Sequence, residues 1–508
     1  MFQKTYSAAL SSLSGHVLEV ECLITNGLPY FNIVGIPAFA AQAARERIRS
    51  ALKSCGYTLP PSRITINVRS LDPASYPITD YGVLDLPITL AILGSQSLVP
   101  SAAVYDSLFL GELSLDGHLR PLAGALTLAR CSSTKTLYLP QDNAAEAALS
   151  QRSNLYGITH LSQLIAALQH KITLPKAEPA KPETIPVSSS LDKIHGQTIA
   201  KRALAIAAAG RHNILLMGPP GCGKTMLSRS MPALLPPLSP NQQLELTEIY
   251  SCCRLLSANQ TLLNSRPFRA PHHSIPVSSL VGGGTNPRPG EITLAHHGVL
   301  YLDELPEFSR AAIESLRQPL EEHSITLNRL RGSVCFPADF LLSASMNPCP
   351  CGYYPDTSRC HCTAAQIAAY QNKIDTPLLE RIDIVLSLLP VSLNEETTPP
   401  SLSEKELQQQ VLRAQKAQQE RYQKSEHFNA RLLPEEISSF CPLSPSLKKI
   451  MEQAGLRYHF SMRSYHKIIK LARTIADVEG SDSIEESHLL EALQYRLRLT
   501  GGGLQKQL

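Results

Sequence analysis

The chain of 508 residues is 43% hydrophobic and 18% charged, which excludes an intrinsically disordered chain and predicts about two to four domains with sizeable cores. Its net charge of +4 permits local basic patches for nucleic acid but does not by itself indicate them. The polar start does not resemble a signal peptide, no apolar run is long enough to span a membrane, and twelve cysteines are too few for a disulfide scaffold, so the sequence predicts a cytoplasmic protein in a reduced compartment.

Residues 1–170 form the first predicted domain, in which short β-like runs alternate with helices. The runs cover residues 17–24, 30–34, 64–68 and 136–139. A helix is predicted over residues 38–55, where Ala44, Ile48 and Leu52 recur at helical spacing, and a second, apolar helix begins at Leu86.

The first predicted helix carries basic residues on the faces that its apolar positions leave free. They are Arg45, Arg47, Arg49 and Lys53. A solvated basic face is the simpler interpretation of such a set, and a surface that contacts phosphate groups is the alternative.

Proline-rich stretches divide the rest of the chain. Residues 171–190 hold four prolines, scattered charge and little apolar content, which predicts an extended, semi-rigid linker. Residues 191–390 alternate helix and strand patterns and predict an α/β domain. A second proline-containing loop covers residues 391–403, and the helical patterns of residues 404–500 predict a small helical domain.

A phosphate-binding loop follows a short apolar run in the predicted α/β domain. The run at residues 213–217 predicts a buried strand, and the helix after the loop is expected to end before Pro232. The loop comprises Gly218, Pro219, Pro220, Gly221, Cys222, Gly223, Lys224 and Thr225. Strand, glycine-rich turn and helix start together point unpaired backbone N–H groups at an anion. The pattern predicts that Lys224 reaches the β- and γ-phosphates of ATP and that the Thr225 hydroxyl holds Mg²⁺.

Three further polar residues end apolar runs and complete a predicted hydrolytic site. Asp303 can hold Mg²⁺, and Glu304 can orient and polarise the attacking water. We expect the strand that ends at Asn347 to lie between the strands of the phosphate-binding loop and of the two acids, where the amide could bond the γ-phosphate or its water.

An arginine precedes the next apolar run. The planar fork of Arg381 suits a phosphoryl group that develops charge. An ion pair with Glu380 or Asp383 is the structural alternative, and the residues alone leave both interpretations open.

Longer motifs give the chain a resemblance to a known family. They are residues 266–273 (RPFRAPHH), 280–284 (LVGGG), 287–296 (PRPGEITLAH), 317–320 (RQPL) and 347–352 (NPCPCG). With the phosphate-binding loop and the acid pair, they resemble the magnesium-chelatase-like AAA+ ATPases of the YifB/ComM family. The resemblance covers nearly the whole chain, since residues 26–35 and 111–121 are similar to the family's N-terminal domain and residues 461–463 and 472–477 to its helical lid.

The resemblance implies a fold and an assembly. The implied fold is an α/β AAA+ P-loop core over residues 191–390 with a C-terminal helical lid, preceded by a Lon-protease-like α+β domain. The implied assembly is a homo-oligomeric ring, a hexamer, with ATP and Mg²⁺ between neighbours. In such a ring Arg381 acts on the neighbour's nucleotide, and Arg463 is the second sensor from the lid, an assignment that rests on the resemblance alone.

One stretch departs from the family pattern. Residues 67–87 are longer than the corresponding stretch of the family and lack its lysine. The departure weakens any suggestion of a Lon-type Ser–Lys protease site in the first domain, and it could alter what that domain binds.

The family includes a DNA helicase that drives branch migration during natural transformation. The resemblance therefore implies an ATP-driven motor on single-stranded or branched DNA, without sequence preference. The alternatives are a magnesium-chelatase-type motor subunit and an ATP-dependent protease or unfoldase. The fused first domain and the paired cysteines favour the DNA motor over the chelatase, and the missing Ser–Lys pair counts against the protease.

Residues 324–336 alternate apolar and polar positions around Gly332 and predict a β-hairpin. Arg329 and Arg331 fall near its tip. In the related minichromosome maintenance helicases a hairpin at this place touches DNA in the channel of the ring, so both arginines are predicted to contact DNA phosphates. An ion pair with Glu321 or Glu322 is the alternative.

Four cysteines lie within fourteen residues as two C-x-C pairs. They are Cys349, Cys351, Cys360 and Cys362. Thiolates so placed in a reduced compartment predict a structural Zn²⁺ site, with free thiols or disulfides as alternatives, and His361 could replace one thiolate. His272 and His273 are interpreted as hydrogen-bonding groups rather than metal ligands.

Overall fold

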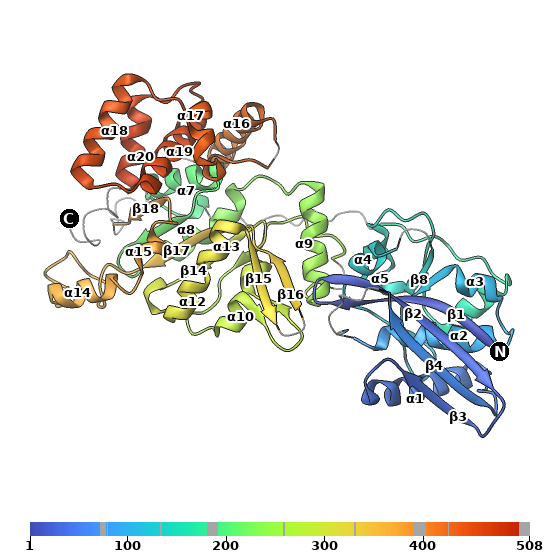
Figure 1. Cartoon of the computed structure of the whole chain (residues 1–508). Coiled ribbons are helices and arrows are strands. Elements are labelled where there is room, and N and C mark those ends of the chain that lie inside the picture. The colour runs from blue at the N-terminus through green and yellow to red at the C-terminus, as the bar shows by residue number, and fades with distance from the viewer. Residues whose placement is uncertain are drawn as a thin grey trace.

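The structure, a computed structural model, describes residues 1–71, 78, 80–132, 135–179, 191–257, 260–329, 332–389, 403–424 and 426–496, with the backbone alone for Arg329 and Gly332. The chain folds into two bodies that lie side by side (Figure 1). We call residues 1–179 the N-terminal body and residues 191–496 the second body, whose helical end after residue 403 is the lid.

A seven-stranded mixed sheet forms the N-terminal body, in the order β3-β4-β2-β1-β5-β8-β9. The strands are β1 (Phe2–Ser11), β2 (Ser14–Thr25), β3 (Tyr30–Val34), β4 (Arg63–Ser70), β5 (Ser107–Phe109), β8 (Thr136–Pro140) and β9 (Leu155–Ile158). The four predicted runs are confirmed as β2, β3, β4 and β8. Strand β1 was not predicted, because its sequence FQKTYSAALS mixes polar and apolar residues, yet Thr5 and Ser7 are buried in the sheet.

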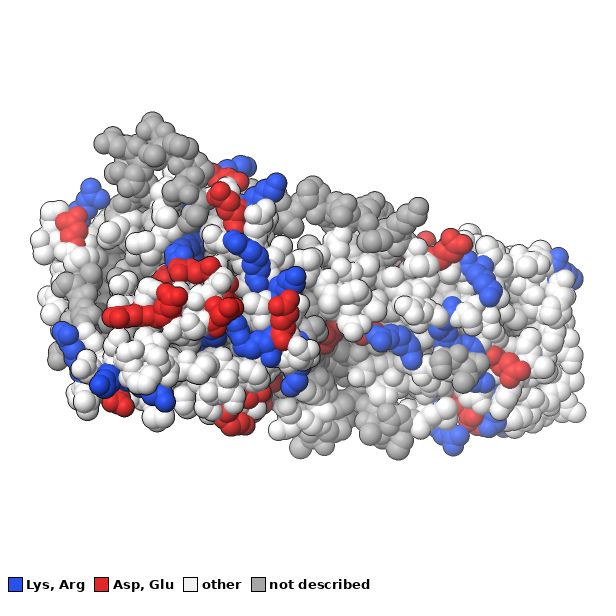
Figure 2. Space-filling model, turned by 90° about the horizontal axis from the view of Figure 1, so that it is seen from above, with Lys and Arg blue, Asp and Glu red and all other residues white. Residues whose placement is uncertain are grey.

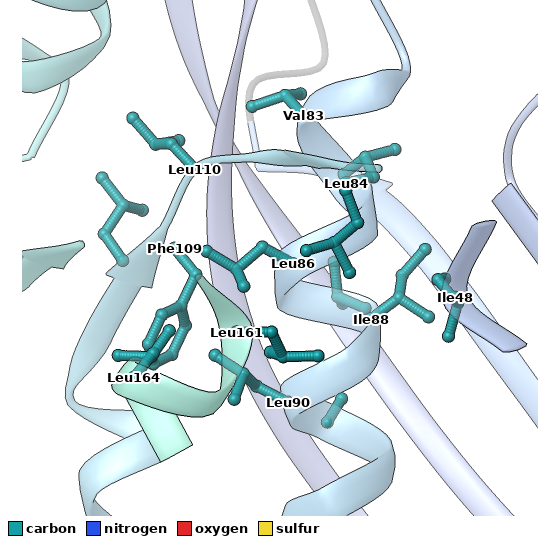
Figure 3. Packing of buried hydrophobic residues seen from close by; sticks show 14 of the residues in the cluster. Ile48, Val83, Leu84, Leu86, Ile88, Leu90, Phe109, Leu110, Leu161 and Leu164 are labelled. Carbon is teal, nitrogen blue, oxygen red and sulfur yellow. The ribbon is translucent and has the colours of Figure 1, made fainter. Parts of the chain in front are cut away.

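Six helices and a small hairpin accompany this sheet. They are α1 (Ala38–Ser54), α2 (Asp85–Ser95), α3 (Ser101–Tyr105), α4 (Ala125–Arg130), α5 (Gln141–Ala148) and α6 (Leu161–Leu168), with β6 (Glu112–Leu113) and β7 (Leu119–Arg120). Every residue of α2 is buried, as its continuous apolar run predicts. Figure 3 shows Leu86 and Leu90 of α2 beside Leu161 of α6 in this core.

The basic face predicted for α1 is only partly solvated, and the simpler interpretation is wrong for Arg47. The Arg47 guanidinium donates two hydrogen bonds, of 2.5 and 3.0 Å, to the carboxylate of fully buried Asp85. Arg45 donates to the Phe31 carbonyl. The buried carboxylate needs this partner, since an unpaired charge in a core is strongly destabilising. Arg49 and Lys53 are left as exposed basic residues of α1.

The first part of the predicted linker packs against the N-terminal body. Leu174 joins its hydrophobic core, and the Ala177 N–H donates to the Leu155 carbonyl next to β9. Residues 171–179 of the predicted linker therefore belong to the N-terminal body, while residues 180–190 lie outside the described residues.

A five-stranded parallel sheet, in the order β11-β14-β17-β10-β18, forms the centre of the second body and confirms the α/β prediction. The strands are β10 (Ile214–Met217), β11 (Phe268–Arg269), β14 (Val299–Leu302), β17 (Leu341–Met346) and β18 (Ile384–Ser387). Side chains alternate between its faces: Ile214 and Leu216 pack with α7, α8 and the lid, whereas Leu215 and Met217 pack toward α10 and α12.

Helices and two hairpins surround this sheet. The helices are α7 (Thr198–Gly210), α8 (Lys224–Leu234), α9 (Pro240–Cys252), α10 (Val277–Val281), α11 (Glu291–Leu294), α12 (Arg310–Ser315), α13 (Arg317–Glu322), α14 (Ala364–Gln371) and α15 (Thr376–Leu379). The hairpins pair β12 (Gly282–Gly283) with β13 (Arg288–Pro289) and β15 (Ser324–Arg329) with β16 (Gly332–Pro337). The expected stop before Pro232 is wrong: α8 continues to Leu234, because Met231 and Leu234 are buried and hold its last turn.

The lid consists of α16 (Glu404–Tyr422), α17 (Pro434–Phe440), α18 (Pro445–Tyr458), α19 (Met462–Glu479) and α20 (Glu486–Arg496). Two contacts fasten it to the segment before β18. Lys467 of α19 lies 2.7 Å from the carboxylate of Asp383, and Arg496 of α20 donates to the Ile382 carbonyl. Loop residues 390–402 lie outside the described residues.

Helix α9 links the two bodies and lies between them in Figure 1. The Ser251 hydroxyl donates to Glu146 of α5 at 2.6 Å and accepts from the Gly124 N–H at 2.9 Å. At the edge of this contact, Arg130 lies 2.6 Å from Glu248. Among the described residues, no helix has the length and apolar character needed to cross a membrane.

Candidate nucleotide-binding site

The predicted site residues meet at one edge of the parallel sheet. Strands β10, β14 and β17 run in the same direction, so the residues that follow them emerge at the same edge. Strand β17 lies between β10 and β14, which confirms the expected position of the asparagine strand. The edge thus gathers a lysine, two acids and an amide from three separate parts of the sequence.

The phosphate-binding loop has the backbone that its glycines predict. Gly221 and Gly223 adopt φ values of 80° and 92°, which glycine adopts most readily, and a Cβ at either would meet no atom within 4 Å. Lys224 begins α8, and its Nζ donates to the Gly218 and Pro219 carbonyls at 2.6 and 3.0 Å. Burial lowers the pKa of this ammonium. The open backbone surface fits the phosphates of a nucleotide, and the lysine lies on the same loop.

Two oxygens at this edge fit a magnesium ion. The Thr225 hydroxyl lies 3.2 Å from Oδ2 of Asp303. Adjacent ligands of octahedral Mg²⁺ are about 2.9 Å apart, given Mg–O distances of about 2.1 Å. A small adjustment would let both oxygens bind one ion, as the sequence predicts.

Buried hydroxyls hold the first of the two acids. The Ser345 hydroxyl donates to Asp303. The single hydroxyl proton of Tyr301 has two acceptors within reach, the Ser345 hydroxyl at 3.1 Å and the Thr225 hydroxyl at 3.3 Å. Burial raises the pKa of Tyr301 to about 12, so its hydroxyl keeps its proton. This network fixes the Asp303 carboxylate beside Thr225.

The second acid stands on an unusual backbone. Glu304 has φ 54°, a left-handed conformation that non-glycine residues rarely adopt. Its side chain is about half exposed, and its N–H donates to Oδ1 of Asp303 at 3.1 Å. Both acids thus stand at the edge of the sheet that carries the phosphate-binding loop.

Asn347 contacts the lysine of the loop. Its Oδ1 accepts a hydrogen bond of 3.0 Å from Lys224 Nζ. The amide thus lies within reach of any group that Lys224 binds, as predicted for a residue that senses the γ-phosphate.

Arg381 and Arg463 meet away from that edge, on a common carboxylate. Arg381 lies 2.8 Å from Oε2 of Glu321, and Arg463 of α19 donates to Oε1. The alternative partners Glu380 and Asp383 are thus wrong for Arg381. Arg463, which the resemblance implies is the second sensor, forms its ion pair with Glu321 of α13, so its role stays a prediction.

The predicted hairpin is confirmed as β15 and β16. The side chain of Arg329 and all of Arg331 lie outside the described residues, so their predicted DNA contacts stay predictions. Glu321, one alternative partner, is held by Arg381 and Arg463, and Glu322 accepts a hydrogen bond from Gln318.

The four clustered cysteines converge as predicted, with all four sulfur atoms within 4.8 Å of one another. Cys349 lies 3.3 Å from Cys351 and 3.7 Å from Cys360. A tetrahedral Zn²⁺ with Zn–S distances of about 2.3 Å separates its sulfurs by about 3.8 Å, so the donors fit this ion. All four are free thiols, which excludes the disulfide alternative in this structure, and His361 is not a member of the group.

The cysteine segment packs on the phosphate-binding loop. Gly352 adopts φ 87°, and a Cβ there would stand only 2.8 Å from Cδ of Pro220. Since the segment begins directly after Asn347, one rigid turn would support both the loop and the sensor amide.

A second group with metal-ligand chemistry does not suit a metal ion. Glu245, His296 and His297 place ligand atoms within 4.8 Å of one another. However, Nδ1 of His296 accepts the Asp339 N–H at 2.9 Å, so its Nε2 carries the proton and donates toward Glu245, 3.2 Å away. A nitrogen that carries a proton cannot bind a metal. The group is a polar cluster in which two buried histidines face the exposed Glu245.

Sequence reasoning missed several groups around the site. His273 lies 3.4 Å from Glu304, and Ser345, Tyr301 and Glu321 make the contacts described above. Strand β11, which places His273, is only two residues long and carries no periodic signal. His272 bonds Ser274, which agrees with its interpretation as a hydrogen-bonding group.

Comparisons with known proteins agree with this geometry. The family model "Magnesium chelatase, subunit ChlI" matches residues 190–396, its C-terminal counterpart matches residues 401–496, and "Subunit ChlI of Mg-chelatase" matches residues 20–143. A parallel sheet with a phosphate-binding loop, an acid pair and a helical lid defines the class of AAA+ ATPases.

Relatives of full length define the family within that class. The chain is 39% identical to the competence protein ComM of Haemophilus influenzae and 37% identical to the uncharacterized protein YifB of Salmonella typhimurium, in each case over 97% of this chain and 96% of the relative. The magnesium-chelatase 67 kDa subunit of Heliobacterium mobile is 29% identical over 33% of this chain. The chain belongs to the YifB/ComM family of magnesium-chelatase-like proteins.

Proposed function

We propose that the protein is an ATP-driven ring motor that acts on DNA, a helicase that promotes branch migration during natural transformation or recombination. The observation that carries the proposal is the placement of the two arginines. Lys224, Asp303, Glu304 and Asn347 share one edge of the sheet, whereas Arg381 and Arg463 meet on Glu321. A second copy of the chain that brings this arginine pair to the nucleotide would complete the site.

One protomer supplies the residues that bind the nucleotide and activate the water. The open backbone of residues 218–223 and Lys224 bind the phosphates. Thr225 and Asp303 would hold Mg²⁺, which would neutralise charge on the phosphate oxygens. Glu304 orients the attacking water and accepts its proton. Asn347 bonds the γ-phosphate while Lys224 turns toward it from the loop carbonyls.

The neighbouring protomer supplies Arg381 and Arg463. Both guanidiniums point at one carboxylate, and a carboxylate and a phosphate present similar oxygens to an arginine fork. Glu321 therefore stands where a phosphate oxygen of the neighbour's nucleotide would bind. Arg381 comes from the segment before β18 and Arg463 from the lid, so one anion would join two parts of the protomer that are distant in sequence.

DNA is the substrate that the family and the hairpin favour. The relative ComM carries the name of a competence protein, which links the family to DNA uptake. On the face shown in Figure 2, basic and acidic side chains are interspersed rather than gathered into one positive surface. Sequence-independent contact with phosphates would then depend on local groups such as Arg329 and Arg331, the two arginines that the sequence predicts near the hairpin tip.

Replacing Arg329 and Arg331 together with alanine is expected to remove most of the stimulation of ATP hydrolysis by DNA and to leave the basal rate unchanged. The physical reason is that two phosphate contacts are lost while the nucleotide site is untouched. The measurement is the ATPase rate with and without single-stranded and forked DNA at stated salt concentrations. Equal loss of basal and stimulated rates would contradict the assignment.

The same assay separates the alternatives. Stimulation of the parent protein by DNA supports the motor on DNA. Stimulation only by an unfolded protein would support the unfoldase, and stimulation only by a partner subunit with a porphyrin would support the chelatase-type motor.

We also propose that the four cysteines hold a structural Zn²⁺. Protein purified without chelator is expected to contain about one zinc per chain, and a Cys349→Ser, Cys351→Ser double variant to contain none. The loss should lower the thermal unfolding temperature, since metal binding contributes to folding. The control is Cys335→Ser, an exposed thiol outside the cluster. Metal-free parent protein with unchanged stability would exclude the site.

A further inference from the structure

A buried arginine, Arg496, lies at the end of α20 and is 1% exposed. Its guanidinium donates to the Ile382 carbonyl and, at 3.5 Å, to the Glu380 carbonyl. These two residues flank Arg381 in the sequence, in the segment that leads into β18. The lid therefore binds the backbone on both sides of one of the two arginines that the proposed mechanism assigns to the subunit interface.

The same guanidinium also reaches the beginning of α19. It donates at 3.2 Å to the Ser464 hydroxyl, and Ser464 directly follows Arg463. The first turn of α19 is itself fixed, because the Ser464 N–H donates at 3.2 Å to the hydroxyl of the N-cap residue Ser461. Arg496 thus connects the two segments that carry Arg381 and Arg463.

The carbonyl of Arg381 is held from another side, by the sheet. Asn213 directly precedes β10, and its Nδ2 donates to this carbonyl at 3.2 Å. The Oδ1 atom of Asn213 accepts the Leu342 N–H of β17 at 2.9 Å. Three consecutive carbonyls, those of residues 380–382, therefore accept hydrogen bonds from two side chains, one in the lid and one at the sheet. Both parts of the second body set the position of the Arg381 backbone.

The chemistry of Arg496 favours positioning over a purely structural role. The oxygen atoms that the described residues bring within hydrogen-bond distance of its guanidinium are two carbonyls and one hydroxyl, and none of them is a carboxylate. Burial lowers the pKa of this cation and opposes folding. An apolar side chain of similar volume often stabilises a core as well as a buried ion does. What the guanidinium adds is a rigid fork of N–H groups that binds several acceptors in fixed directions.

We propose that Arg496 is a positioning residue for the arginine pair: by binding the backbone beside Arg381 and the residue beside Arg463, it sets where both guanidiniums meet the phosphates of the neighbouring subunit's nucleotide. The inference rests on the proposed function, in which these arginines act across a subunit interface. In that mechanism Arg381 exchanges Glu321 for a phosphate oxygen, so the position of its backbone sets its reach. Misplacement of a catalytic group by about 1 Å slows a reaction about 100-fold.

The first test is Arg496→Met in the full-length protein, which removes the hydrogen bonds and keeps a long side chain. We expect kcat for ATP to fall about 10- to 100-fold with the Kd for ATP unchanged, because the displaced arginines slow chemistry and not binding. Arg496→Lys keeps the charge, but its compact ammonium cannot span the carbonyls and the hydroxyl together, so a smaller loss is expected.

The matched control is Arg473→Met. Arg473 is another buried arginine of the lid, and its carboxylate partner is Asp477, four residues further along α19. This variant is expected to lower the thermal unfolding temperature and to keep the parental kcat. It shows what the loss of a buried cation from the lid does when the arginine pair is left in place.

Mixing experiments separate positioning across the interface from a general defect. Arg496→Met protein mixed with Lys224→Ala protein forms interfaces that combine the intact loop of the first with the intact arginines of the second. ATP hydrolysis in this mixture is expected to rise above the sum of the separate rates. Mixed with Arg381→Ala protein, the same variant supplies only displaced arginines, and little recovery is expected. A defect of folding or assembly would affect both mixtures equally.

Three outcomes overturn the inference. They are a parental kcat for Arg496→Met, equal recovery in the two mixtures, and a loss of ATP binding that accompanies the loss of kcat. If the methionine variant does not fold, Arg496→Lys carries the same mixing test. A mixture of Arg381→Ala with Lys224→Ala contains no change at position 496, so absence of recovery there would instead overturn the proposed shared site. The two failures are therefore distinguishable.

Discussion

Replacing Arg381 with alanine is expected to lower ATP hydrolysis by about 10³- to 10⁵-fold while ATP binding is retained. The reason is that Arg381 pairs with Glu321 and has no contact with the phosphate-binding loop of its own protomer among the described residues. It would neutralise charge on the neighbour's phosphoryl group only in the transition state. Steady-state ATPase rates and nucleotide binding measure the two effects separately.

The control is Arg310→Ala, since Arg310 is an exposed arginine of α12 whose partner Glu314 lies one turn away. Mixing Arg381→Ala protein with Lys224→Ala protein provides a sharper test. Each variant alone lacks one part of the site, whereas an interface with the loop of the first and the arginine of the second is complete. Partial recovery of activity is expected on mixing. Parental activity of the Arg381→Ala variant, or of a solitary subunit, would refute the shared site.

Replacing Glu304 with glutamine is expected to lower kcat by about 10²- to 10⁴-fold and to leave ATP affinity intact. Glutamine has nearly the same shape as glutamate but cannot accept a proton from the attacking water. The Asp303–Ser345–Thr225 network that would hold Mg²⁺ does not depend on the Glu304 side chain. Single-turnover hydrolysis and equilibrium ATP binding are the measurements.

A nearby acid provides the matched control. Glu307 lies three residues further on, lines the same cleft and contacts Lys373 at 3.0 Å. Glu307→Gln is expected to hydrolyse ATP at close to the parental rate. Equal losses in the two variants would show that general loss of negative charge, and not the base at position 304, explains the effect.

Local chemistry explains which parts of the fold were predictable. The phosphate-binding loop and the Asp303–Glu304 pair were predictable from the sequence, because each follows a fully buried apolar strand. The same logic placed Asn347 correctly. Strand β1 was not predicted because its buried positions include the polar residues Thr5 and Ser7. Their polarity obscures the alternation of apolar and polar residues that indicates a strand.

Pairings between distant segments were not predictable from the residues. Arg381 has acids on both sides in the sequence, Glu380 and Asp383, yet its partner is Glu321 from α13. Asp383 is instead occupied by Lys467 of the lid. Likewise, the sequence favours a solvated position for Arg47 on its helix, whereas the fold places buried Asp85 beside it. A single sequence shows which residues are charged, but the tertiary fold determines which of them form ion pairs.

The fastening of the lid to the segment before β18 has a consequence for the order of events in an assembly. Lys467 holds Asp383, which is two residues from Arg381, and Arg463 begins the same lid helix that carries Lys467. A rotation of one lid would therefore move Arg381 and Arg463 toward or away from the nucleotide site of the neighbouring protomer. In the proposed ring, such a linkage would favour sequential ATP hydrolysis from one subunit to the next over independent hydrolysis at each subunit.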